Sequence, residues 1–228
     1  MSTVPARLLS FTATTVGKKV VMAATGIILF GFLVGHVAGN LQIFAGAEKI
    51  NAYSKFLHET PSLLWGARGV LLVALVAHIA SVVSLYRLRA EARPVPYAKK
   101  RHRGATLPAI AMLASGVAVV GFIVFHLAHF TTGHATFALK GGEFIDLDPY
   151  HNMLNAFRLG WVALLYIVAM WLVGMHLAHG LWSMTQSLGF SHPRWTARIR
   201  PLAGAVAFCL ALAFAIIPIA VALGFGGK

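Results

Sequence analysis

Five long apolar stretches constrain what this chain can fold into more than any other feature of its sequence. They run over about 20–44, 63–87, 106–132, 157–187 and 202–224. Each is long enough for a helix to cross a bilayer, which takes roughly 20 residues. A helix satisfies its own backbone hydrogen bonds, so such segments are stable in lipid. The sequence therefore predicts an all-α integral membrane protein with five transmembrane helices, in which residues 1–228 form a single domain.

Composition and charge exclude several other classes of protein. The chain has 228 residues, of which 58% are hydrophobic and 11% charged, and this leaves little mass for a soluble domain. Its net charge of +13 lies in the connecting segments, so we expect a lipid membrane and not nucleic acid as its partner. The single cysteine, Cys209, excludes an intramolecular disulfide. Residues 1–17 lack the compact apolar core and cleavage site of a signal peptide.

The charges alternate from one connecting segment to the next. The N-terminus and the loops at 87–103 and 188–200 are basic. The first of these loops carries Arg87, Arg89, Arg93, Lys99, Lys100, Arg101 and Arg103. The other two loops are acidic and hold Glu48, Glu59, Glu143, Asp146 and Asp148. Because basic loops stay in the cytoplasm, we expect a cytoplasmic N-terminus and a C-terminus outside. Docking of a cytoplasmic partner on the basic loops is a compatible additional interpretation.

The first four apolar stretches each contain a histidine. These residues are His36, His78, His126 and His176. An ionisable side chain within the membrane is costly and by default indicates a functional site. Two imidazoles that approach from opposite helices are a common way for a membrane bundle to hold the iron of a haem. We therefore expect the first four helices to form a bundle that binds two haem b groups, with the fifth helix outside this ligand set.

The depths of the histidines predict how they pair. In the helices that run outward, His36 and His126 lie towards the outer ends, so they can hold an outer haem. In the helices that run inward, His78 and His176 lie past the midpoints, so they can hold an inner haem. At 1.5 Å of rise per residue the two layers would be roughly 10–20 Å apart.

Two further histidines leave the ligand assignment open on these grounds alone. His129 and His179 each follow a proposed ligand by three residues and lie on nearly the same helix face. Either could compete for the iron or donate a hydrogen bond to a haem propionate. Beside His36, a stripe of glycines at 31, 35 and 39 allows the close approach of a macrocycle, although helix packing alone also explains it.

Five sequence pieces carry a resemblance to a known family. They are GHVAGNLQIF at 35–44, INAYSKFLHE at 50–59, VAHIAS at 76–81, FHLAHF at 125–130 and HLAHGLWS at 176–183. In this order they resemble the di-haem cytochrome b subunit, of the b558 group, of succinate:quinone oxidoreductases. The resemblance covers essentially the whole chain. Single pieces are weak, but the ordered set with a fifth helix that lacks histidine is specific.

The resemblance places the family's axial ligands on His36, His78, His126 and His176, with the same pairing that the depths predict. By the same comparison His126 is preferred to His129, and His176 to His179. One position departs from the pattern. Some fumarate reductases of the family carry a glutamate for proton movement two residues before the fourth ligand, and here that position is Gly174. Proton coupling of that design is therefore in doubt.

The resemblance also implies an enzyme complex in the cytoplasmic membrane of a prokaryote. A flavoprotein subunit would interconvert succinate and fumarate, and an iron–sulfur subunit would carry electrons to the membrane. This chain would anchor both subunits and exchange electrons with menaquinone or another quinone. The chain itself shows no dinucleotide-binding glycine fingerprint, P-loop or cysteine cluster.

Two other functions stay open at this stage. One is a cytochrome b subunit of a formate dehydrogenase or hydrogenase, or a b561-type reductase, although the ordered pieces fit these poorly. The other is a haem-free transporter with a histidine-lined path. Such a protein should show further polar residues or interrupted helices at a midplane site, whereas these spans hold little besides His, Ser and Thr.

The outer segment 51–59 is the candidate quinone site. Quinone chemistry needs a proton carrier close to a haem edge, and this segment offers Asn51, Tyr53, His58 and Glu59. The resemblance adds weight to Glu59, since relatives use an acidic residue at about this place. In the alternative interpretation, Glu59 only solvates a loop and helps to start the second helix before Pro61. A quinone site at the cytoplasmic face is also open.

Overall fold

The protein is all-helical wherever the structure describes it. The computed structural model describes residues 11–92, 95, 106–138, 143–190 and 192–227, and it contains no strand in these ranges. Much of the basic loop predicted between the second and third spans lies outside the described residues, including Arg93, Lys99, Lys100, Arg101 and Arg103.

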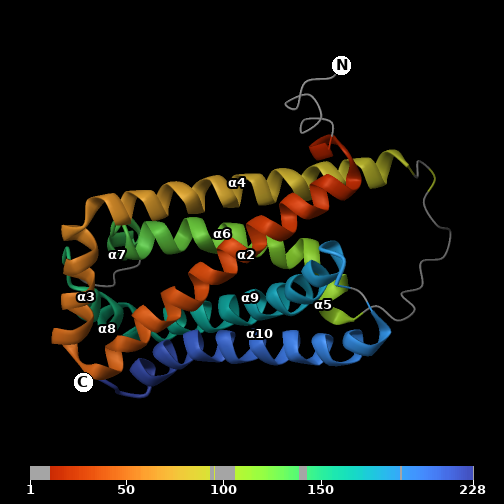
Figure 1. The fold of residues 1–228 in the computed structure, drawn as a ribbon. Coiled ribbons are helices and arrows are strands. Elements are labelled where there is room, and N and C mark those ends of the chain that lie inside the picture. The colour runs from red at the N-terminus through yellow and green to blue at the C-terminus, as the bar shows by residue number, and fades with distance from the viewer. Residues whose placement is uncertain (1–10, 93–94, 96–105, 139–142, 191, 228) are drawn as a thin grey trace.

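Five helices are long and apolar enough to cross a membrane, as predicted. They are α2 (Thr15–Asn40), α4 (Pro61–Glu91), α6 (Met112–Phe130), α9 (Gly160–Ser187) and α10 (Pro193–Ala222). Shorter elements connect them: η1 (Leu41–Ala45), α3 (Ala47–Glu59), α5 (Leu107–Ile110), α7 (His134–Ala138) and α8 (Pro149–Arg158). The start of α2 and the end of α10 lie at opposite ends of the bundle (Figure 1), as an odd number of crossings requires.

Several helix boundaries differ from the sequence prediction, most clearly in the fifth and third spans. The fifth helix begins at Pro193, with the His192 side chain accepting a hydrogen bond from the Arg194 backbone N–H, and Pro201 lies inside it. The prediction that it starts at residue 202, after Pro201, is therefore wrong. A proline suits the first turn of a helix, and Pro193 occupies that position here. The third span is divided at Ala111 into α5 and α6.

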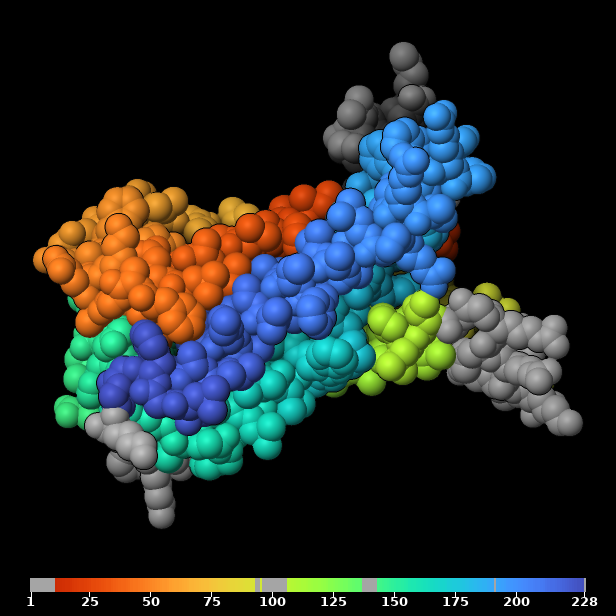
Figure 2. Space-filling view, turned by 90° about the horizontal axis from the view of Figure 1, so that it is seen from below, coloured from red at the N-terminus to blue at the C-terminus, as the bar shows by residue number. Residues whose placement is uncertain are grey.

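Small residues determine how the last two transmembrane helices pack. In α10, Ala203, Ala207, Ala211 and Ala215 recur every four residues, and all are buried. Because small side chains let two helix backbones come close, α10 lies along α9 over much of its length. Figure 2 shows α10 crossing one face of the molecule between α2 and α9.

The transmembrane helices form two groups that contact each other sparingly. Helix α2 packs along α4, whereas α6 packs on α9 and α9 on α10. Contacts between the groups come from α2 against α9 and α10, while α4 makes no comparable contact with α6 or α9 in the described part of the chain. The histidine-bearing faces of the two groups therefore meet without tight helix packing between them.

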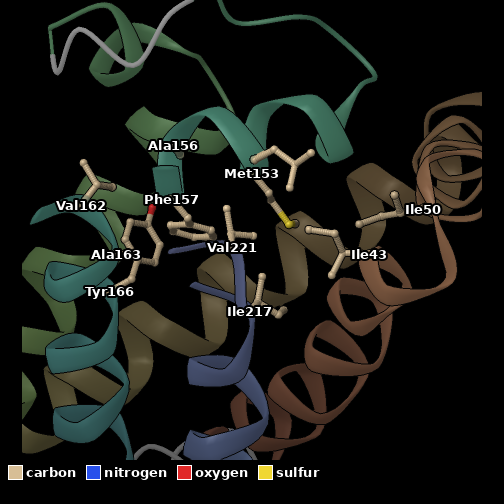
Figure 3. Close-up of a cluster of buried hydrophobic side chains, with 11 residues drawn as sticks. Ile43, Ile50, Met153, Ala156, Phe157, Val162, Ala163, Tyr166, Ile217 and Val221 are labelled. Atoms are coloured by element: carbon tan, nitrogen blue, oxygen red, sulfur yellow. The ribbon is translucent and has the colours of Figure 1, made fainter. Parts of the chain in front are cut away.

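A cap of short helices joins the two groups at one end (Figure 1). Buried side chains from η1, α3, α8, α9 and α10 form one apolar cluster here, and Tyr166 lies within it beside Phe157, at 5.0 Å between ring centroids (Figure 3). Above the cluster, Asn51 of α3 donates a hydrogen bond to the carboxylate of Asp148, which precedes α8, at 2.9 Å. The same carboxylate accepts from the His151 backbone N–H and caps α8.

Candidate functional site

The first pair of predicted ligands, His36 and His126, meets in the half of the bundle next to the cap. His36 projects from α2 and His126 from α6, and their ring centroids are 5.8 Å apart with the ring planes 85° to each other. Phe32, one turn before His36, stacks on the His36 ring at 5.1 Å. Phe214 of α10 lies 5.8 Å from the same ring. Aromatic neighbours thus hold the first ring of this outer pair.

Tyr166 of α9 supplies the polar contacts beside the outer pair. Its hydroxyl oxygen lies 3.4 Å from Nδ1 of His126 and 2.9 Å from Nδ1 of His129. Tyr166 is 5% exposed and His129 only 1%. Both groups are therefore withdrawn from solvent, and each provides a hydrogen-bond partner for a buried polar atom of the other.

The second pair, His78 of α4 and His176 of α9, occupies the other half of the bundle. The two side chains lie within electrostatic reach of each other. His78 Nδ1 is 3.1 Å from the Thr25 hydroxyl and 3.2 Å from the Met22 carbonyl oxygen, both on α2. A Cβ atom on Gly26 would lie 3.7 Å from the His78 ring, an ordinary contact distance, so the ring lies directly against α2.

His176 has a corresponding environment on α6. Its Nδ1 lies 3.5 Å from the Ser115 hydroxyl. A Cβ atom on Gly116 would come within 3.3 Å of the His176 ring, tighter than most side-chain contacts allow. The two inner histidines are thus each held by a hydroxyl and an adjacent glycine of a neighbouring helix.

The hydroxyl partners determine which imidazole nitrogen is free. Thr25 donates its own proton to the Val21 carbonyl at 2.8 Å, and Ser115 donates to the Met112 carbonyl at 3.2 Å. Each hydroxyl oxygen therefore accepts a hydrogen bond from Nδ1–H of its histidine. This leaves Nε2 of His78 and of His176 with a lone pair, which is the form of imidazole that binds a metal.

The two pairs lie at different heights along the bundle. Tyr166 belongs to the outer pair's surroundings and His176 to the inner pair, and both are on α9. Their positions along the helix, at 1.5 Å of rise per residue, separate the two layers by about 15 Å.

Two pairs of histidines on different helices are a donor set that suits axially ligated haem, and the spacing of the outer pair can be compared with what such ligation needs. Metal–nitrogen bonds of about 2 Å would put the centroids of two opposed imidazole rings roughly 6 Å apart, close to the 5.8 Å of the outer pair. Near His36, Gly31 and Gly35 are exposed, and a Cβ atom on either would meet nothing within 4 Å, so no described side chain packs closely on this part of α2. Among the described residues there is no cluster of three or more metal-ligating side chains, but a haem iron needs only two.

Several other predicted site residues lie away from the pairs. His179 is half-buried and within electrostatic reach of Arg200 on α10. Glu59 is 65% exposed, with a carboxylate oxygen 3.7 Å from the Lys55 ammonium. Tyr53 lies beside α2, because its ring packs against Gly39, three residues after His36. A Cβ atom built on Gly39 would be 2.8 Å from the Tyr53 ring. Asn51 bridges to Asp148 and to the Tyr150 backbone in the cap.

Sequence reasoning missed three polar side chains next to the histidines. Thr25 and Ser115 carry no signal in the sequence, since a hydroxyl in an apolar helix ordinarily bonds to its own backbone. Tyr166 does carry a signal, because a tyrosine within a transmembrane span needs a hydrogen-bond partner. A search for that partner would have led to the histidines at 126 and 129.

Comparison of this chain with family models, with curated proteins and with solved structures finds no match.

Proposed function

We propose that this chain is a membrane-embedded di-haem cytochrome b that serves as the anchor and electron-transfer subunit of a succinate:quinone oxidoreductase. The observation that carries the cytochrome proposal is the arrangement of four intramembrane histidines as two pairs, about 15 Å apart along α9. Each pair takes its members from different helices, and this is the geometry by which a helical bundle holds an axially ligated haem.

In this proposal His36 and His126 ligate the outer haem, and His78 and His176 ligate the inner haem. When bound, the haems would supply one-electron redox chemistry at two depths of the membrane. Thr25 and Ser115 contact Nδ1 of His78 and of His176. These contacts would orient the two rings and leave each Nε2 free to bind the haem iron. Phe32 stacks on His36 and restricts its rotation.

The complex around this subunit follows from the family resemblance. A flavoprotein and an iron–sulfur subunit would dock at the end where α2 begins and α9 ends, which is basic. The described basic residues there include Lys18, Lys19, Arg87, Arg89, Arg194, Arg198 and Arg200. Electrons would enter or leave through the inner pair at this end. We propose menaquinone or another quinone as the electron partner, with Glu59 as the proton carrier of an outer quinone site.

A redox-titrated visible spectrum of the purified complex tests the proposal. We expect two haem b groups per chain, resolved as two one-electron transitions, together with co-purifying flavoprotein and iron–sulfur subunits. A preparation that folds and assembles without any haem would overturn the cytochrome proposal and favour a haem-free transporter. Two haems with a formate dehydrogenase or hydrogenase partner would overturn only the assignment to succinate:quinone oxidoreductase.

A further inference from the structure

Tyr166 joins the two histidines of the FHLAHF segment through one hydroxyl group. Its oxygen lies 3.4 Å from His126 Nδ1 and 2.9 Å from His129 Nδ1. Phe122, Phe130 and Phe157 surround the tyrosine ring, with centroid distances of 5.2, 5.7 and 5.0 Å. The ring is thus fixed by packing, and the hydroxyl can change only the direction in which its own proton points.

Because the Tyr166 hydroxyl has a single proton, it must be the donor in one of these two hydrogen bonds and the acceptor in the other. Tyr166 has one proton to donate and lone pairs to accept. It can therefore donate to one of the two Nδ1 atoms, and the other Nδ1 must be protonated and donate to it. The two histidines are consequently held in opposite tautomers. The one that donates from Nδ1–H keeps a free Nε2 for a metal, and the other carries its proton on Nε2.

The surroundings of the two rings decide which histidine has the free Nε2. The His126 ring faces His36 across the bundle. His129 instead stacks closely with Phe130, at 4.3 Å between centroids, and is 1% exposed. The Thr136 hydroxyl donates to the His129 backbone carbonyl at 3.1 Å and fixes this turn. His126 can therefore reach an iron between itself and His36, whereas His129 is enclosed by protein.

We propose that Tyr166 is a positioning residue of the outer haem: it accepts a hydrogen bond from His126 Nδ1–H and donates its proton to His129 Nδ1. This inference rests on the proposed function and adds the reason why His126 rather than His129 is the ligand. A hydrogen bond from Nδ1–H makes the imidazole a stronger electron donor. Tyr166 therefore favours the oxidised iron and holds the outer haem at a lower reduction potential.

The Tyr166→Phe variant tests the role of the hydroxyl without removing the ring. We expect both haems to stay bound and the outer haem alone to become easier to reduce, by about tenfold in its equilibrium, which is about 59 mV for one electron. The inner haem provides an internal reference in the same titration. Tyr86→Phe is the matched control, since Tyr86 is 56% exposed on α4, and neither haem should change.

Variants at His129 test the direction of the hydrogen bonds. His129→Leu removes the acceptor of the tyrosine proton, so we expect the outer haem to be retained and easier to reduce. His129→Asn places an amide oxygen near the position of Nδ1 and should return the potential towards that of the unchanged protein. The Tyr166→Phe and His129→Leu shifts should not add in the double variant, because both act through one hydroxyl.

Different results separate this inference from the proposed function. If the unchanged protein binds no haem, the proposed function fails. If it binds two haems but His129→Leu loses the outer one while His126→Ala keeps it, His129 is the ligand and the inference is overturned. An unchanged outer potential in a fully loaded Tyr166→Phe protein also overturns it, with the proposed function intact.

Discussion

A Cβ atom built on Gly174 would lie 3.0 Å from the Cβ of Ala211. α9 and α10 pack closely at these two residues, and Ala211 belongs to the buried alanine stripe of α10. Gly174 is also the position where some fumarate reductases of the resembling family carry a glutamate. In this chain a side chain at position 174 would press against Ala211 of α10, so the tight packing of α9 on α10 favours glycine there.

We expect Gly174→Leu to destabilise the protein by roughly 1–3 kcal/mol, because an added side chain forces two packed helices apart. Thermal unfolding of the purified protein in detergent measures the loss. Gly204→Leu is the control, since a Cβ atom there meets nothing within 4 Å. The double variant Gly174→Ala, Ala211→Gly should be more stable to heat than Gly174→Ala alone, because the second change removes the Cβ that the new one meets. An equal loss in both leucine variants would contradict the packing argument.

Removal of single ligands should remove single haems. His36→Ala or His126→Ala should abolish the outer haem and spare at least part of the inner one, and His78→Ala or His176→Ala should do the converse. His179→Ala should retain both. Haem content and the two redox transitions give the measurement. Loss of a haem in His179→Ala, with both kept in His176→Ala, would reverse the choice of the fourth ligand.

The two inner hydroxyls should contribute unequally to the inner haem. In Thr25→Val, His78 Nδ1 keeps the Met22 carbonyl as an acceptor at 3.2 Å, so the potential should change little. In Ser115→Ala, His176 loses the only hydrogen-bond partner described for it, so the inner haem should become easier to reduce. A redox titration checks both variants. A larger shift in Thr25→Val than in Ser115→Ala would count against this account.

Labelling from outside the cell tests the orientation. After Cys209→Ser, a new cysteine at Phe190, which is 67% exposed between α9 and α10, should resist a membrane-impermeant maleimide in intact cells. A cysteine at the exposed Glu143 should react. Reaction at position 190 alone would invert the predicted topology.

Glu59→Gln should suppress quinone-linked turnover, because the amide cannot carry the quinone's proton. Both haems should remain, and succinate oxidation with an artificial acceptor should continue. Lys55→Gln removes the ion-pair partner of Glu59 and controls for a change in local charge alone. Normal quinone turnover in a fully loaded Glu59→Gln enzyme would exclude Glu59 from the mechanism.

Much of the fold could be predicted from the sequence, because the length and hydropathy of a segment are enough to identify a membrane-spanning helix. The pairing of His36 with His126 could also be predicted, since helix direction and residue depth fix which histidines share a layer. Helix ends were less predictable. Pro193 and Pro201 satisfy the same start rule, and only the packing of α10 distinguishes the first proline, which begins the helix, from the second, which lies within it.

The hydrogen-bond partners of the histidines could not be predicted, because they depend on rotation about helix axes. Thr25 faces His78 only because α2 crosses α4 at this height, and no pattern in a helix that is apolar all round reveals that rotation. The contacts of the candidate quinone residues could not be predicted for the same reason. Spacing along the chain placed Glu59 near the outer end of the first helix, but the fold puts Tyr53 rather than Glu59 against Gly39.

The division of the helices into two groups has a consequence for biogenesis. The α2–α4 pair and the α6–α9–α10 group are each made of segments close in sequence, so each has a low contact order and can assemble locally. At a synthesis rate of about 5–20 residues per second, the first hairpin is complete while the second group is still on the ribosome. Contacts between the groups can form only after the later helices have been made, and the Asn51–Asp148 hydrogen bond in the cap is one of the contacts that must wait for them.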